Sequence, residues 1–265
     1  MVKEGKIIVN GEPIDYISFG KGKRNLVMIQ GLNTGGFKGS GVMLSLMYRI
    51  FSKEYTVYLF DRPRGACSNI TIEDLAESII DAMSAMKIDK ADILGVSQGG
   101  MIAQYIALKL PESVGKMVLA FTLARSNELV TSAINSWVSM VENDDYKQLV
   151  TDMAERMYSE KYLKKYRPLL PLLAILQKPK DKVRFINLAK SCLSCDTPDY
   201  LDKIHCPVLV IGAENDKIVG DEASREIADI LGCELFIYKE LGHAAYEEAA
   251  KDFNKRVYDF LVARE

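Results

Sequence analysis

The sequence predicts an α/β protein with a mostly parallel central sheet, helices on both faces of that sheet, and one inserted helical lid. Three observations predict this class. Short apolar runs without polar–apolar alternation are typical of strands that are buried on both faces. Helix-like stretches separate most of these runs, as in strand–helix–strand units with right-handed crossovers. Residues 123–202 contain no convincing strand, so 80 residues are inserted between two strands of the sheet.

Composition narrows the possible partners of the chain. The 265 residues carry a formal net charge of −2 and are 48% hydrophobic, which is ordinary for a globular protein and excludes a disordered scaffold. The balanced charge gives no field that would favour nucleic acid or an anionic membrane, so we expect a small-molecule substrate. The sequence leaves open whether the protein forms a homodimer.

The cysteines and the N-terminus indicate a cytoplasmic protein. The five cysteines are scattered, and Cys192 and Cys195 form a C-x-x-C without the further ligands that a zinc site needs. We expect plain buried or half-buried thiols, no metal and no cofactor. The N-terminus is charged and turns into a strand, which is not the pattern of a signal peptide. The longest apolar run, Leu169–Leu176, is interrupted by Pro171 and is too short to cross a membrane.

The elements follow in order from the N-terminus. Ile7–Val9 and Ile14–Phe19 flank Asn10-Gly11, which predicts a hairpin because both turn residues tolerate positive φ. Further strands are predicted at Leu26–Ile29, Thr56–Phe60, Ile93–Val96, Met117–Phe121, Val208–Ile211 and Glu234–Tyr238. Helices are predicted at Val42–Phe51, Thr71–Met86, Gln98–Leu110, Asp221–Leu231 and Ala244–Val262.

Residues 1–122 and 203–265 are therefore expected to form the core, and residues 123–202 the lid. The lid is expected to contain helices at Glu128–Val141, Asp145–Tyr158 and Lys180–Leu193. Three prolines, Pro168, Pro171 and Pro179, are expected to separate helices, because proline cannot continue a helix.

A nucleophile is predicted where the strand at Ile93–Val96 meets the following helix. Residues 95–100 read Gly-Val-Ser-Gln-Gly-Gly, a G-x-S-x-G with a strand before it and a helix after it. The tight turn strains its central residue, and the flanking glycines remove Cβ atoms that would clash. Ser97 should therefore stand exposed at the carboxyl edge of the sheet.

A serine nucleophile needs an imidazole base, and the chain has only two histidines. His205 precedes the strand at Val208–Ile211, which places it at the amino edge and predicts a structural role. His243 follows the last strand, at the carboxyl edge, and is the predicted base.

The base needs an orienting carboxylate on a neighbouring loop. The strand at Val208–Ile211 runs into a loop that contains Glu214 and Asp216. We favour Asp216, with Glu214 as its rival. The oxyanion is expected to bind the backbone N–H of Gln98, at the start of the helix, and that of Leu32, in the loop Gln30–Gly36.

With these motifs in place, the chain resembles the α/β-hydrolase superfamily, specifically small lidded serine hydrolases such as carboxylesterases and enol-lactonases. The resemblance is carried by the elbow GVSQGGMIAQ, the acid loop VLVIGAENDKIV, the histidine turn LGHAAY and the segment DRPRGACS. The last is similar to the family's D-x-x-G-x-G-x-S loop, with Ala66 and Cys67 altering the glycine spacing. A serine at the elbow argues against the dehalogenase and epoxide-hydrolase branches, which use aspartate.

The chain departs from the family at the oxyanion loop. The family commonly has His-Gly there, whereas this chain has Gln30-Gly31. Because the donor is a backbone group, the oxyanion hole can be kept, but the support that the histidine gives must come from other residues.

The predicted activity is hydrolysis of a small carboxylic ester, thioester or lactone through an acyl-enzyme on Ser97. The alternatives are a C–C bond hydrolase or cofactor-free perhydrolase on the same triad, and a non-enzymatic small-molecule receptor of the same fold. The lid is expected to supply apolar pocket residues, and these are Trp137, Met140, Met153, Met157 and Tyr158.

Overall fold

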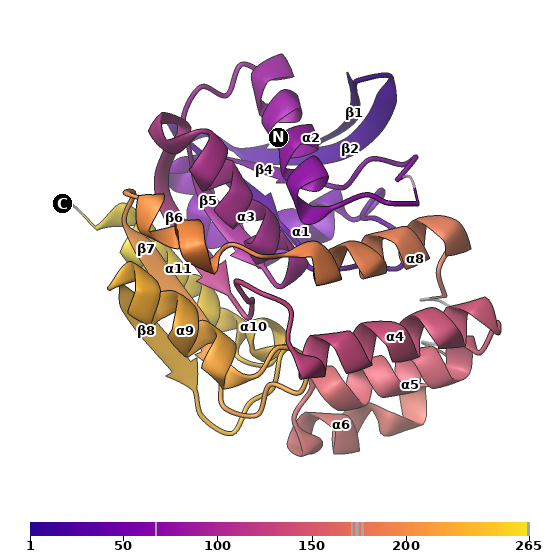
Figure 1. Ribbon diagram of the computed structural model, residues 1–265. Coiled ribbons are helices and arrows are strands. Elements are labelled where there is room, and N and C mark those ends of the chain that lie inside the picture. Colours follow the sequence, from indigo (N-terminus) through magenta and orange to yellow (C-terminus); the bar gives the residue numbers. More distant parts are fainter. Residues whose placement is uncertain (67, 171, 173–174, 176–177, 264–265) are drawn as a thin grey trace.

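The computed structural model describes residues 1–66, 68–170, 172, 175 and 178–263. Within this part of the chain, eight strands form one sheet: β1 (Lys3–Val9), β2 (Glu12–Gly20), β3 (Arg24–Ile29), β4 (Tyr55–Phe60), β5 (Ala91–Val96), β6 (Val114–Ala120), β7 (Val208–Ala213) and β8 (Glu234–Tyr238). Their spatial order is β1-β2-β4-β3-β5-β6-β7-β8 (Figure 1). β2 runs antiparallel to both β1 and β4, and the other pairs are parallel. The predicted fold class, with a mostly parallel sheet, is confirmed.

Helices cover both faces of this sheet. The described helices are α1 (Gly41–Met47), α2 (Ile72–Ala85), α3 (Gln98–Lys109), α4 (Glu128–Glu142), α5 (Tyr146–Met157), α6 (Glu160–Tyr166), α8 (Lys182–Ser191), α9 (Asp221–Leu231), α10 (Ala245–Glu248) and α11 (Ala250–Val262). None of them combines the length and the apolar character that crossing a bilayer requires.

The buried apolar residues form two clusters, which the alternation of side chains along each strand assigns to opposite faces of the sheet. In β5, Ile93 belongs to the cluster that contains α2, α3 and α9, whereas Leu94 belongs to the cluster that contains α11. The central strands therefore bury both faces, which explains why their sequences are continuously apolar.

Two helices predicted as continuous are interrupted. The helix predicted at Val42–Phe51 ends at Met47, and a 3₁₀ segment follows at Arg49–Lys53. The helix predicted at Ala244–Val262 is divided into α10 and α11 at Ala249, whose φ and ψ are −114° and 34°. Neither break contains a glycine or proline. The apolar periodicity continues across both breaks, and it therefore predicts one continuous helix in each case.

The segment between β6 and β7, here called the insertion, contains α4, α5, α6 and α8 and contributes no strand to the sheet. α4 packs against α5 and α8, and Figure 1 shows α8 between the core and the group formed by α4, α5 and α6. The helix α6 was not predicted, although Ser159 caps it by accepting a hydrogen bond from Tyr162 N–H. Pro168 lies in a 3₁₀ turn after α6 and Pro179 precedes α8, while Pro171 lies outside the described residues.

Hydrogen bonds fasten the insertion to the segment that follows β8. Ala244 N–H donates to the carbonyl of Met157 at 2.8 Å. Glu248 accepts from the Ser159 N–H at 2.7 Å and from the Ser159 hydroxyl at 2.5 Å. We call these contacts the seam. They join the carboxyl end of α5 to the residues that directly follow His243.

Candidate active site

Ser97 occupies the turn between β5 and α3. Its φ of 53° and ψ of −121° lie in a region that non-glycine residues rarely adopt, and such strain is characteristic of functional sites. The surrounding backbone holds it there: Ser97 N–H donates to Ala120 O, and Ser97 O accepts from Thr122 Oγ1, both at 2.8 Å. The strain is therefore supported by β6 and the residue just beyond it.

The second glycine of the motif is required because α3 approaches β3 closely. A Cβ on Gly99 would lie 1.9 Å from the carbonyl oxygen of Ile29, which is backbone and cannot rotate away. We expect Gly99→Ala to lower the free energy of unfolding by about 3 kcal/mol, measured by urea denaturation. Gly35→Ala is the control, since its nearest neighbours are side-chain atoms of Lys180 at 3.7 Å. Equal stability of the two variants would contradict this explanation.

The structure brings Ser97, His243 and Asp216 together at the carboxyl edge of the sheet. His243 Nε2 lies 3.0 Å from Ser97 Oγ, and His243 Nδ1 lies 2.7 Å from Asp216 Oδ2. His243 is only 3% exposed. The three residues thus form a continuous line of hydrogen-bonding groups in which the imidazole can accept a proton from the hydroxyl.

The carboxyl group of Asp216 is held in its ionised form. Its Oδ1 accepts the N–H groups of Ile218 and Val219 at 2.8 and 3.0 Å. Burial alone raises the pKa of Asp216, but the charge and hydrogen bond of His243, together with these two N–H groups, outweigh burial and hold the pKa below its usual value. An ionised carboxylate fixes the Nδ1–H tautomer of the imidazole, which leaves Nε2 free to act as base.

The two rivals lie elsewhere. Glu214 is exposed and accepts the N–H of Glu240 at 3.2 Å, so it does not contact the imidazole. His205 lies before β7, at the opposite edge of the sheet, as expected. The prediction that it is structural is wrong, however, because its side chain is exposed.

A cysteine shares the surroundings of Ser97 but is a poor nucleophile. Cys192 is buried, and burial raises the pKa of its thiol to about 11. It is therefore protonated at neutral pH, and the thiolate is the reactive form. Cys195 is also buried, while Cys206 and Cys233 are half-buried. Cys67 lies outside the described residues.

The two predicted oxyanion donors flank Ser97. Gln98 N–H is the first of α3, and neither it nor Leu32 N–H donates to another protein group within the described part of the chain. A Cβ built on Gly31, the residue before Leu32, would lie 3.7 Å from Ser97 Oγ. Two unoccupied backbone donors next to the hydroxyl suit an oxyanion hole.

The side chain of Arg62 supports both of these backbone segments. It is 1% exposed, and its Nη2 donates to the carbonyls of Gln30, at 2.6 Å, and Gly31. Its Nε and Nη2 also donate to Gln98 Oε1 at 3.0 and 2.9 Å. Burial lowers the pKa of Arg62 to about 10, so the guanidinium stays charged at neutral pH. Sequence reasoning missed this residue, which holds the Gln30-Gly31 loop in place.

Two adjoining cavities lead to Ser97. The smaller, the triad cavity, has a volume of about 40 Å³ and is lined by residues that include Ser97, His243 and Trp137. The larger, the chamber, has a volume of about 460 Å³. Its lining includes residues 28–34, α1 and Tyr48, residues of the insertion between 150 and 170, Tyr246 and Glu247, together with Leu59, Leu94 and Val96 of the sheet. The cavities share Gly31, Leu32, Met153, Met157 and Tyr246.

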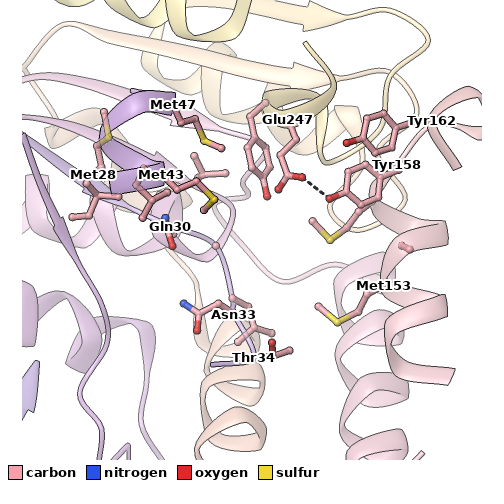
Figure 2. A pocket seen from close by; sticks show the side chains of 18 of the residues that line it. Met28, Gln30, Asn33, Thr34, Met43, Met47, Met153, Tyr158, Tyr162 and Glu247 are labelled. Atoms are coloured by element: carbon pink, nitrogen blue, oxygen red, sulfur yellow. Dashed lines mark hydrogen bonds between the residues drawn. The ribbon is translucent and has the colours of Figure 1, made fainter. Parts of the chain in front are cut away.

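Four of the five predicted pocket residues line a cavity. Trp137 lines the triad cavity, Tyr158 lines the chamber, and Met153 and Met157 line both. Met140 lines neither and packs against the hydrophobic core instead. Figure 2 shows Met43 and Met47 on one side of the chamber and Tyr158 and Tyr162 on the other.

Sequence reasoning named Tyr158 as a pocket residue but missed Tyr162 and Tyr166, which line the chamber beside it. Tyr162 and Tyr166 lie one turn apart on α6, and Tyr158 lies in extended backbone just before that helix. Their rings follow one another with centroids 4.8 and 4.4 Å apart. The spacing of four residues is visible in the sequence. Because no helix was predicted at Glu160–Tyr166, the spacing did not indicate that these rings lie together.

Comparison with known proteins agrees with this architecture. A family profile described as alpha/beta hydrolase fold matches residues 25–250. A 2-hydroxy-6-oxononadienedioate/2-hydroxy-6-oxononatrienedioate hydrolase from Klebsiella pneumoniae is 27% identical, over 92% of this chain and 88% of its own length.

Solved structures show the same fold. The alpha/beta hydrolase MGS-M2 from a Medee basin deep-sea metagenome library superposes with a TM-score of 0.87 at 21% identity, covering 98% of each chain. The enol-lactonase from Burkholderia xenovorans LB400 superposes with a TM-score of 0.83 at 20% identity, covering 98% of this chain and all of its own. From the matched profile, the named relatives and the shared fold, we conclude that this chain is a hydrolase and belongs to the α/β-hydrolase fold family.

Proposed function

We propose that the protein is a serine hydrolase that cleaves a carboxylic ester, thioester or lactone through an acyl-enzyme on Ser97. The observation that carries this proposal is the pair of hydrogen bonds at His243, 3.0 Å to Ser97 Oγ and 2.7 Å to Asp216 Oδ2. His243 takes the proton of the hydroxyl as Ser97 attacks the carbonyl carbon, and Asp216 stabilises the imidazolium that forms.

The tetrahedral intermediate carries its negative charge on the former carbonyl oxygen. The N–H groups of Leu32 and Gln98 bind this oxygen, and each such donor is worth about 3 kcal/mol of transition-state stabilisation. His243 then returns its proton to the leaving alcohol, thiol or enol. Water, activated by the same imidazole, attacks the acyl carbon and releases Ser97.

The cavities define the shape of the substrate. The triad cavity of about 40 Å³ admits only a small group beside Ser97, whereas the chamber of about 460 Å³ admits a large one. The chamber wall is mostly methionine, leucine and tyrosine. These dimensions favour a substrate with one small and one bulky apolar side. In this proposal the insertion, whose residues line both cavities, acts as the lid.

Ester hydrolysis is preferred over the cleavage of a C–C bond in an acidic substrate. The Klebsiella relative is named for a dioate, which carries two carboxylates. Neither cavity contains a lysine or arginine among its described lining residues, so neither offers a cation to bind such groups.

A fluorophosphonate probe tests the proposed nucleophile, because it phosphonylates only an activated serine. The wild-type protein should be labelled and Ser97→Ala should not, as read by intact-protein mass spectrometry. Ser78→Ala is a control, since Ser78 lies on α2 and its hydroxyl donates to the carbonyl of Asp74; it should remain labelled. Equal labelling of wild type and Ser97→Ala would overturn the proposal.

A further inference from the structure

The chamber has an unusual distribution of charge. Of its 25 described lining residues, Glu247 alone is formally charged at neutral pH. The others are apolar residues, tyrosines, glycine, threonine and the amides Gln30 and Asn33. A substrate that fills the chamber therefore meets one negative charge and no positive one.

Glu247 lies among tyrosine rings. Its Oε2 accepts the hydroxyl proton of Tyr158 at 2.5 Å, and Tyr162 stacks on Tyr158 with ring centroids 4.8 Å apart. Figure 2 shows this carboxylate beside Tyr158, with Met47 toward the opposite wall. Within the described residues, no lysine or arginine forms an ion pair with Glu247, so its charge is not neutralised by the protein.

The tyrosines around Glu247 stay neutral, and their rings are available as aromatic faces. Burial and then the charge of Glu247 raise the pKa of Tyr48 to about 12. The same two causes raise the pKa values of Tyr158 and Tyr246. At neutral pH the wall therefore presents uncharged phenol rings around a single carboxylate.

We propose that the chamber selects substrates whose bulky side carries a cationic group, an amine or quaternary ammonium, seated against Glu247 and the tyrosines. Aromatic faces attract cations through their quadrupole, and a carboxylate adds a direct charge attraction. The same carboxylate repels an anionic substrate. This inference rests on the proposed function, because it assumes that the group in the chamber belongs to the molecule cleaved at Ser97.

The size of the effect follows from the exposure of Glu247. Its side chain is exposed, so water and salt screen its charge more than they would screen a buried one. We therefore expect a selectivity of about fivefold from this carboxylate, which is the upper end of what an exposed ion pair contributes.

The test compares three p-nitrophenyl esters of matched length that differ in terminal charge. They are the 6-(trimethylammonio)hexanoate, its carbon isostere 7,7-dimethyloctanoate, and the hydrogen pimelate. The ratio of kcat/KM for the cationic ester to that for the isostere should fall about fivefold in Glu247→Gln. The pimelate monoester should be the poorest substrate of the wild-type enzyme and should improve in the variant.

Glu248→Gln is the matched control. It removes the same charge one residue away, at the seam rather than in the chamber wall, and should leave the ratio within about twofold of wild type. A ratio that is unchanged in Glu247→Gln, or one that falls equally in both variants, would overturn the inference. So would hydrolysis of the pimelate monoester as efficient as that of the cationic ester.

A binding measurement separates this inference from the proposed function. Ser97→Ala is titrated calorimetrically with decyltrimethylammonium and, in matched buffers, with the neutral analogue 2,2-dimethyldodecan-1-ol, in which carbon replaces the nitrogen and one methyl carries a hydroxyl. Binding of the cation that weakens about fivefold with the further change Glu247→Gln supports the inference even if no ester is cleaved. Absence of that weakening contradicts the inference, whereas loss of ester turnover with retained cation binding contradicts only the proposed chemistry.

Discussion

Replacing His243 with alanine is expected to lower kcat/KM for ester hydrolysis by about 10⁴- to 10⁶-fold. The imidazole is the group within hydrogen-bonding distance of Ser97 Oγ. Asp216 cannot replace it, because Asp216 contacts the imidazole at Nδ1, on the side away from Ser97. Without the base, the hydroxyl must attack while still carrying its proton. Initial rates with a p-nitrophenyl ester give the measurement, and the Ser97→Ala variant gives the background.

The control for this prediction is the other histidine of the chain. His205 is exposed at the opposite edge of the sheet, so His205→Ala should leave kcat/KM within about twofold of wild type and change the free energy of unfolding by no more than about 0.5 kcal/mol. Activity that survives in His243→Ala, or disappears in His205→Ala, would show that the proposed assignment of the base is incorrect.

Replacing Arg62 with methionine is expected to lower kcat by about 10²- to 10³-fold with little change in KM. Its guanidinium fixes the carbonyls of Gln30 and Gly31 and the side chain of Gln98, and so positions both oxyanion donors. These donors bind charge that exists only in the transition state, so their displacement lowers kcat rather than substrate affinity. Steady-state kinetics below the unfolding transition measure both parameters.

The variant will also be less stable, and a second variant separates the two effects. Arg184 contacts Asp61 Oδ1 at 3.3 Å and the carbonyl of Arg62 at 3.1 Å, but not the Gln30-Gly31 loop. Arg184→Met should therefore lower the melting temperature while keeping kcat within about threefold of wild type. If kcat falls equally in Arg184→Met and Arg62→Met, Arg62 contributes only stability.

The parts of this structure that could be predicted from the sequence are those set by local pattern. A strand buried on both faces is continuously apolar whatever packs on it, as β5 and β7 show. Placing Ser97, Asp216 and His243 at one edge required only knowing which strand each one follows, because parallel strands end at the same edge. Chain order alone was therefore enough to bring them near one another.

The parts that could not be predicted depend on contacts between distant segments. Arg62 acts through residues 30, 31 and 98, and nothing near it in sequence marks those partners. Trp137 and Met140 are three residues apart on α4, yet only Trp137 reaches a cavity. Which of two neighbouring side chains faces a cavity depends on how the helix is rotated, and periodicity does not determine that rotation.

The seam constrains how substrate and product can pass. Because Ala244 N–H binds Met157 O and Glu248 binds Ser159, pulling α5 away at this point would displace the loop that carries His243. On the opposite wall of the chamber Met43 of α1 is exposed, and among the described residues no hydrogen bond joins α1 to α5 or α6. Substrate and product that pass beside α1 would leave the loop of His243 in place. The enzyme would then not have to rebuild its catalytic geometry at every turnover.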